Sequence, residues 1–71
     1  MDQKTYNVSV YTQETQLWTT TATGTTTEDA YAGIHPIICA RSEVMDAKAA
    51  GTGVFVTVTE MNGTDTQTFT V

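Results

Sequence analysis

The tetrapeptide Met61-Asn62-Gly63-Thr64 constrains the fold more than any other feature of this sequence, because it lies between two runs of alternating residues. Asn-Gly favours a two-residue hairpin turn, since both residues tolerate a positive φ. Such a turn pairs Met61 with Thr64 and sets the register outward from there. The predicted core face carries Val54, Val56, Val58, Phe69 and Val71. The opposite face carries Phe55, Thr57, Thr59, Met61, Thr64, Thr66, Thr68 and Thr70.

A second, looser hairpin is predicted at the N-terminal end. Tyr6, Val8 and Val10 alternate with polar residues, which is typical of a half-buried strand. Residues 12–16 form the connection, and residues 17–23 form the next strand. We expect Trp18 and Ala22 to point inward as part of the core, with Leu17 outward. Residues 5–10 and 67–71 are the candidate edge strands of the sheet.

The segment between the hairpins has a helical pattern. Thr26 or Thr27 is a suitable N-cap, and Glu28 and Asp29 follow where the helix dipole favours acids. Gly51 is the expected C-terminal stop. The apolar stripe that should face the sheet contains Ala30, Ile34, Ile37, Ile38, Arg41 and Met45, and Val44 extends it.

Pro36 interrupts this helical pattern, because proline removes a helix hydrogen bond and clashes with the preceding turn. Three arrangements are open: one kinked helix, two helices with Pro36 in the first turn of the second, or an extended segment over residues 36–41. We favour the kinked helix, because the stripe keeps its phase across Pro36. The predicted fold is therefore one α+β domain over residues 1–71, in the order ββαββ. Its four-stranded, mostly antiparallel sheet carries one kinked helix on one face.

Size and charge limit the function classes. The chain has 71 residues, eight acids and three bases, for a net charge of −5. Without clustered Lys or Arg we expect no direct nucleic-acid binding, whereas a basic protein partner fits the charge. No apolar segment is long enough to span a membrane. The absence of a signal segment and the unpaired Cys39 predict a cytoplasmic protein, in the host cytoplasm if it is viral. Because so small a domain has no disulfide to stabilise it, we expect a homo-oligomer.

One group of residues has chemical potential. His35, Cys39 and Glu43 are spaced by four, so a continuous helix would place them along one stripe. Such a set could activate a thiol or share a metal ion. Pro36 interrupts the spacing, no oxyanion-hole segment accompanies the thiol, and cysteine is common as a small buried residue. We therefore predict no catalytic residue, no cofactor and no metal site.

The predicted function is a small acidic module that docks on a larger protein, such as an inhibitor or adaptor encoded by a phage or mobile element. Small size, acidity and a helix on a sheet are shared by many phage-encoded inhibitors, although no motif identifies a family. The alternative is a virion-type assembly subunit that self-associates through its threonine-rich sheet. An enzyme using His35 and Cys39 is the weakest option. The candidate partner-binding residues are Tyr11, Phe55 and Met61 on the open sheet face, and Glu28, Asp29, Glu43 and Asp46 on the helical segment.

Overall fold

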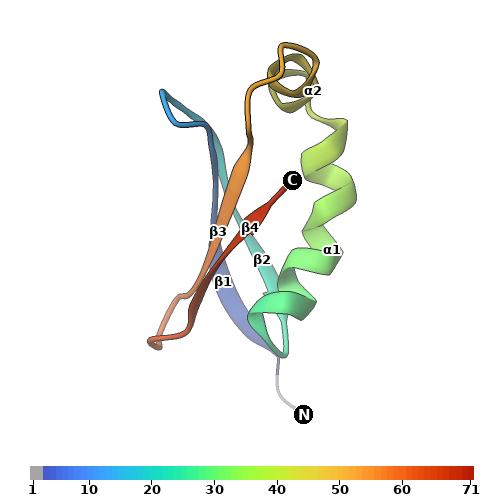
Figure 1. Cartoon of the computed structure of the whole chain (residues 1–71). Helices are drawn as coiled ribbons and strands as arrows, with labels where there is room; N and C mark the ends of the chain where they lie inside the picture. The colour runs from blue at the N-terminus through green and yellow to red at the C-terminus, as the bar shows by residue number, and fades with distance from the viewer. Residues whose placement is uncertain (1–2) are drawn as a thin grey trace.

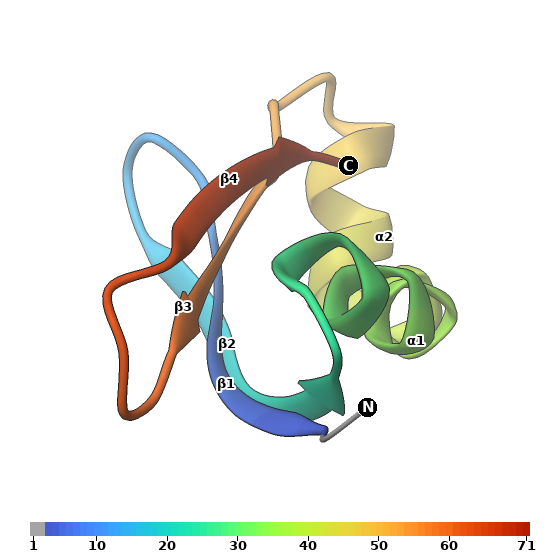
Figure 2. The same cartoon turned by 90° about the horizontal axis from the view of Figure 1, so that it is seen from below.

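Four strands and two helices follow one another in the order ββααββ (Figure 1). The computed structural model describes residues 3–71. The elements are β1 (Lys4–Tyr11), β2 (Gln16–Gly24), α1 (Thr27–Ala40), α2 (Ser42–Ala49), β3 (Phe55–Glu60) and β4 (Thr66–Thr70). The strands form one antiparallel sheet, and the sheet bends around the side on which α1 lies (Figure 2). The α+β class and the four-stranded antiparallel sheet are confirmed, but the helix count is not.

The order of strands across the sheet is β2-β1-β3-β4. Strand β1 therefore lies in the interior, so the prediction of residues 5–10 as an edge was wrong, while β4 is an edge as expected. The helical segment allows this arrangement because it crosses one face of the sheet and returns the chain to the free side of β1. The two edge strands are β2 and β4.

The register of the C-terminal hairpin is the predicted one, with Phe55 opposite Thr70 and Thr59 opposite Thr66. The turn itself differs, because in the described chain only Gly51 has a positive φ. The reason lies in β1: the Met61 N–H donates to the Thr5 carbonyl at 3.0 Å, so this N–H cannot also donate to the Thr64 carbonyl, as a two-residue turn requires. The hairpin closes one pair earlier, where the Glu60 N–H donates to the Asp65 carbonyl at 2.8 Å.

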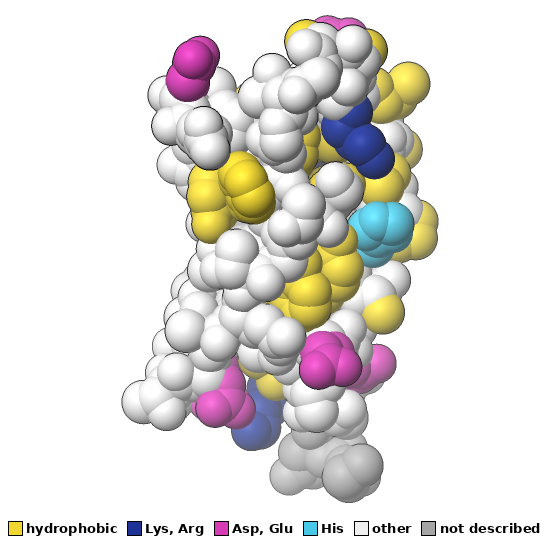
Figure 3. All heavy atoms as spheres, in the orientation of Figure 1, with side chains coloured by type: hydrophobic (Ala, Val, Ile, Leu, Met, Phe, Trp, Pro, Cys, Tyr) yellow, Lys and Arg dark blue, Asp and Glu magenta, His cyan; other side chains and the backbone are white. Residues whose placement is uncertain are grey.

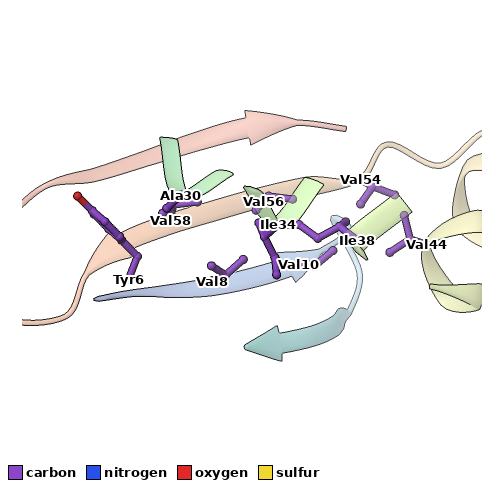
Figure 4. Close-up of a cluster of buried hydrophobic side chains, with 10 residues drawn as sticks. All are labelled: Tyr6, Val8, Val10, Ala30, Ile34, Ile38, Val44, Val54, Val56 and Val58. Atoms are coloured by element: carbon purple, nitrogen blue, oxygen red, sulfur yellow. The ribbon is translucent and has the colours of Figure 1, made fainter. Parts of the chain in front are cut away.

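The core lies between the sheet and the helices, and its side chains come from β1, β3, the segment before β3 and both helices (Figure 4). The valines expected on the core face of β3 are confirmed there, and Phe69 and Val71 pack at its margin. The buried apolar residues are Tyr6, Val8, Val10, Ala30, Ile34, Ile38, Val44, Val54, Val56 and Val58.

The single kinked helix was a wrong prediction, because the chain forms two helices. Pro36 lies inside α1, which continues to Ala40. The break comes at Arg41, which takes an extended conformation with φ −76° and ψ 137°. At this position Arg41 packs over the Trp18 ring and pairs with Glu43, so its side chain is held on both sides. The N-cap at Thr26 and the stop at Gly51, whose φ is 81°, are confirmed.

The break also changes the apolar stripe. Ala30, Ile34 and Ile38 are buried as predicted. Ile37 is 52% exposed and Met45 is 57% exposed, so neither faces the sheet. Once α2 takes its own direction, Val44 becomes its buried residue. The predicted stripe was therefore right for Ala30, Ile34, Ile38 and Val44, and wrong for Ile37 and Met45.

A β-bulge explains where Leu17 lies. Val10 is opposite Trp18, but Tyr11 is opposite Gln16, so Leu17 is the extra residue on β2. Both Leu17 and Trp18 pack partly buried against the core, which corrects the prediction that Leu17 points outward. Trp18 and Ala22 are on the core side as predicted, although Trp18 is only half-buried.

Candidate docking surface

The sheet face away from the helices carries only uncharged side chains among the described strand residues. Strand residues alternate between the two faces, and the even-numbered residues of β1 and β3 face the core. The charged strand residues Lys4 and Glu60 share that even-numbered side and form an ion pair of 2.9 Å at one end of the sheet. The open face consists of Thr5, Asn7, Ser9, Tyr11, Gln16, Thr19, Thr21, Thr23, Phe55, Thr57, Thr59, Thr66, Thr68 and Thr70.

Hydroxyl groups on the open face bond to one another across strands. The Tyr11 hydroxyl lies 2.8 Å from the Thr57 hydroxyl, which lies 3.1 Å from that of Thr68. Thr59 and Thr66 form a further pair at 3.0 Å. These groups already have protein partners, so covering the face with another protein removes fewer bonds to water than covering isolated hydroxyls would.

Two aromatic residues form the apolar part of the open face. The Tyr11 and Phe55 rings have centroids 5.9 Å apart and are tilted by 35°, and both residues are half-buried. Met61 does not join them. Phe55 begins β3, and Met61 follows its end about 20 Å away along an extended strand. The structure therefore brings together two of the three apolar candidates predicted on this face.

The four acidic candidates fall into two groups at opposite ends of α1. Glu28 and Asp29 are in its first turn, whereas Glu43 and Asp46 are on α2. A helix of 14 residues is about 21 Å long, so the two groups cannot form one compact patch.

Two of these acids have internal partners. The Asp29 carboxylate accepts from the backbone N–H of Thr25 at 2.9 Å and from its hydroxyl at 3.3 Å. The Glu43 carboxylate accepts from the Arg41 guanidinium at 2.6 Å. Glu28 and Asp46 are exposed. Asp29 and Glu43 therefore have structural contacts that the sequence pattern did not reveal.

The His35, Cys39 and Glu43 stripe is divided by the break at Arg41. His35 Nε2 lies 3.3 Å from Cys39 Sγ on α1, as four-residue spacing predicts. Glu43 instead belongs to α2 and pairs with Arg41. Over residues 3–71, no three His, Cys, Asp or Glu side chains are close enough together to hold a metal ion. The pair has a thiol and an imidazole, and the carboxylate expected to join them is turned to Arg41.

Two residues shift their pKa through these surroundings. The Glu60 carboxylate raises the pKa of Lys4 above 10.5, chiefly by the hydrogen bond and then by its charge. Burial against the protein raises the pKa of Tyr31 above 10.0, and the charge of the Cys39 thiolate adds to this. Neither residue belongs to the open face.

Sequence reasoning placed Tyr11 of β1 on the open face but did not name two other β1 residues there, Asn7 and Ser9. Asn7 lies opposite Thr21 and Thr59, and Ser9 lies opposite Thr19 and Thr57. The alternation of β1 was visible in the sequence, but its place between β2 and β3 was not. Only that place makes Asn7 and Ser9 central to the face.

Comparisons of this chain with protein-family models, curated protein sequences and solved structures found no match. Neither helix in the described part of the chain is long and apolar enough to cross a membrane. The open face and its surrounding charges therefore supply the evidence on function.

Proposed function

We propose that this chain is a small protein-binding module that docks on a larger protein through its open sheet face. The observation that carries the proposal is the Tyr11–Phe55 pair within an uncharged, hydroxyl-rich surface of a protein with net charge −5. The cores of protein interfaces are depleted in charge and enriched in aromatic residues. Tyrosine and phenylalanine give large contact areas at a low cost in side-chain entropy.

The distribution of acids supports a partner with basic groups around its docking site. Glu14 lies in the β1–β2 connection, and Asp65 lies beside β4 at the other end of the sheet. In one view of the surface, Asp and Glu side chains gather toward the two ends of the molecule (Figure 3). Charges around an uncharged centre speed the encounter with a complementary partner and set its orientation. We propose that the chain acts on that partner as an inhibitor or an adaptor.

A second candidate function is an assembly subunit that contacts its own copies. It is favoured by the absence of charged side chains on the open face, since two copies can meet there without bringing acids opposite each other. The threonine hydroxyls of each copy can stay paired within that copy when the two faces meet, as those of Thr57 and Thr68 are.

The test compares variants of the open face with a variant of the helical face. Phe55→Thr and Tyr11→Thr remove the aromatic rings, and the threonine that replaces each of them still suits a strand. Ile37→Thr is the matched control, because Ile37 is also apolar but lies on α1 and is 52% exposed. Each immobilised variant is used to capture proteins from the cells in which the gene occurs, and captured proteins are then purified for titration.

We expect a protein that binds the unmodified chain and Ile37→Thr with equal affinity, and that binds Phe55→Thr at least tenfold more weakly. Such a loss is typical of an aromatic residue at the centre of an interface. Equal binding of the partner by Phe55→Thr and Tyr11→Thr would contradict the proposal. Mass measurements on the same variants separate the assembly alternative, which requires self-association without any other protein.

A further inference from the structure

The free edge of β2 has an unusual composition for an exposed strand. β2 is an edge strand of nine residues, QLWTTTATG, with neither a charged residue nor a proline. The uncharged stretch extends on both sides, from Thr15 to Thr27. Edge strands usually carry charges, prolines or bulges that prevent pairing with another chain. On β2 the bulge at Leu17 affects only the beginning of the strand.

The alternation of hydrogen bonds identifies the backbone groups on that edge. The Thr5 carbonyl bonds to Met61 at the end of β3, so odd-numbered residues of β1 point toward β3. Even-numbered residues of β1 consequently bond to β2, where Tyr6 is opposite Ala22 and Val8 is opposite Thr20. The intervening residues Thr19, Thr21 and Thr23 must then direct their N–H and C=O groups to the free edge.

These three threonines form a pattern that can pair with itself. In an antiparallel arrangement with a twofold axis at Thr21, Thr21 lies opposite the partner's Thr21, and Thr19 lies opposite the partner's Thr23. Three such pairs exchange about six backbone hydrogen bonds. Their side chains all lie on the open face, where the chain already pairs Thr57 with Thr68 and Thr59 with Thr66. Cross-strand threonine pairs of this kind stabilise a sheet.

We propose that a second copy of this chain pairs with β2 along its free edge, about a twofold axis at Thr21. The two sheets then continue into one, and the two open faces lie side by side on the same surface. No like charges meet across the contact, because β2 has none. The dimer contact is independent of the docking function proposed above, since it uses the backbone edge and not the Tyr11–Phe55 pair.

The other edge is a poorer site for a second copy. β4 also directs alternate threonines outward, but it has five residues, and Asp65 directly precedes it. Pairing of β2 in one copy with β4 in the next is a head-to-tail contact, which builds larger rings or open polymers and not a twofold dimer. Dimers are therefore distinguishable from rings and open polymers by mass.

The first experiment measures mass by light scattering over a concentration series for three proteins. Thr21→Pro removes an N–H that faces the free edge and leaves the β1–β2 bonds in place. Thr68→Pro is the matched control, because it removes the corresponding N–H on the β4 edge. Circular dichroism shows whether each variant is folded. We expect dimers for the unmodified chain and Thr68→Pro, and a dimer dissociation constant at least tenfold higher for Thr21→Pro.

The second experiment keeps the proposal testable if a proline variant does not fold. Thr21→Cys and Thr68→Cys are each made with Cys39→Ser, so that the introduced thiol is the only one. A short bis-maleimide should link Thr21→Cys into dimers in high yield and leave Thr68→Cys mostly unlinked. A chain that stays monomeric at every concentration, equal linking of both variants, or polymers that Thr68→Pro abolishes would overturn the proposal.

Discussion

The guanidinium carbon of Arg41 lies 4.1 Å from the centroid of the Trp18 ring. This contact joins the residue between α1 and α2 to the edge strand β2. The Arg41 side chain also pairs with Glu43 on the first turn of α2. One side chain therefore holds the sheet, the end of α1 and the start of α2 in a common arrangement.

We expect Arg41→Lys to lower the free energy of unfolding by about 0.5–1 kcal/mol, although it keeps the positive charge. Lysine cannot stack a planar group on the indole and bond to Glu43 at the same time. Urea unfolding followed by the fluorescence of Trp18 measures the change. Lys48→Gln, which removes an exposed cation elsewhere on α2, is the control and should have little effect. Equal stability of Arg41→Lys and the unmodified chain would show that the stacking contributes nothing.

Two glycines should respond in opposite directions to substitution by alanine. A Cβ on Gly24 would lie 2.6 Å from the Ala30 backbone nitrogen, so Gly24→Ala must push β2 away from α1. We expect it to lower the free energy of unfolding by about 1–3 kcal/mol. A Cβ on Gly33 meets nothing within 4 Å, so Gly33→Ala in the interior of α1 should raise it by about 0.5–1 kcal/mol. Thermal unfolding of both variants tests the pair, and a stable Gly24→Ala would disprove the close approach.

Pro36 should lower the stability of α1, because it lies inside the helix and cannot donate to the preceding turn. We expect Pro36→Ala to raise the free energy of unfolding by about 1–3 kcal/mol, part of the gain being lost because the unfolded chain becomes more flexible. Pro36→Gly restores the same N–H with a poorer helix former and should gain about 1 kcal/mol less. Denaturant unfolding ranks the three proteins. A lower stability for both variants would mean that the helix requires the proline.

Alkaline pH should destabilise the protein through Tyr31, whose ring stacks on Phe69 at a centroid distance of 4.0 Å. Because burial raises the pKa of Tyr31 above 10.0 in the folded chain, the folded state holds this proton more tightly than the unfolded state. The resulting stability is complete below about pH 10 and is lost as the pH rises through the folded pKa.

Tyr31→Phe keeps the ring and removes the proton, so its stability should fall less steeply than that of the unmodified chain above pH 10. Thermal unfolding from pH 7 to pH 11 measures both slopes. Tyr11→Phe is the control on the opposite side of the sheet. Parallel stability curves for Tyr31→Phe and the unmodified chain would contradict a raised pKa at Tyr31.

Local patterns predicted most of the strands and their faces. The alternation of Val54, Val56 and Val58 with threonines requires that one set be buried, since a slip of one residue would expose all three valines. The helix start at Thr26 and the stop at Gly51 follow from groups within a few residues of each. For the candidate site, the same alternation placed Tyr11 and Phe55 on the open face, and the structure brings them together.

Several features depended on residues far apart in the chain and were not predicted. The turn at Asn62 and Gly63 differs from the predicted one because the Met61 N–H bonds to the carbonyl of Thr5 on β1. Glu43 was assigned to a docking surface, but it pairs with Arg41, whose guanidinium packs over the distant Trp18 ring of β2. Such contacts compete with local preferences of only about 1 kcal/mol, so the tertiary partner decides the outcome.

The sequence by itself determined that this chain forms two hairpins with a helical segment between them, and which face of each hairpin is apolar. These properties follow from the period of side-chain directions along one element, which local residues set. Only the tertiary structure decided that β1 lies beside β3, that the helical segment breaks at Arg41 and that Thr19, Thr21 and Thr23 turn their backbone groups to a free edge. Each of these depends on which strand lies next to which, and that is decided by the burial of the whole core.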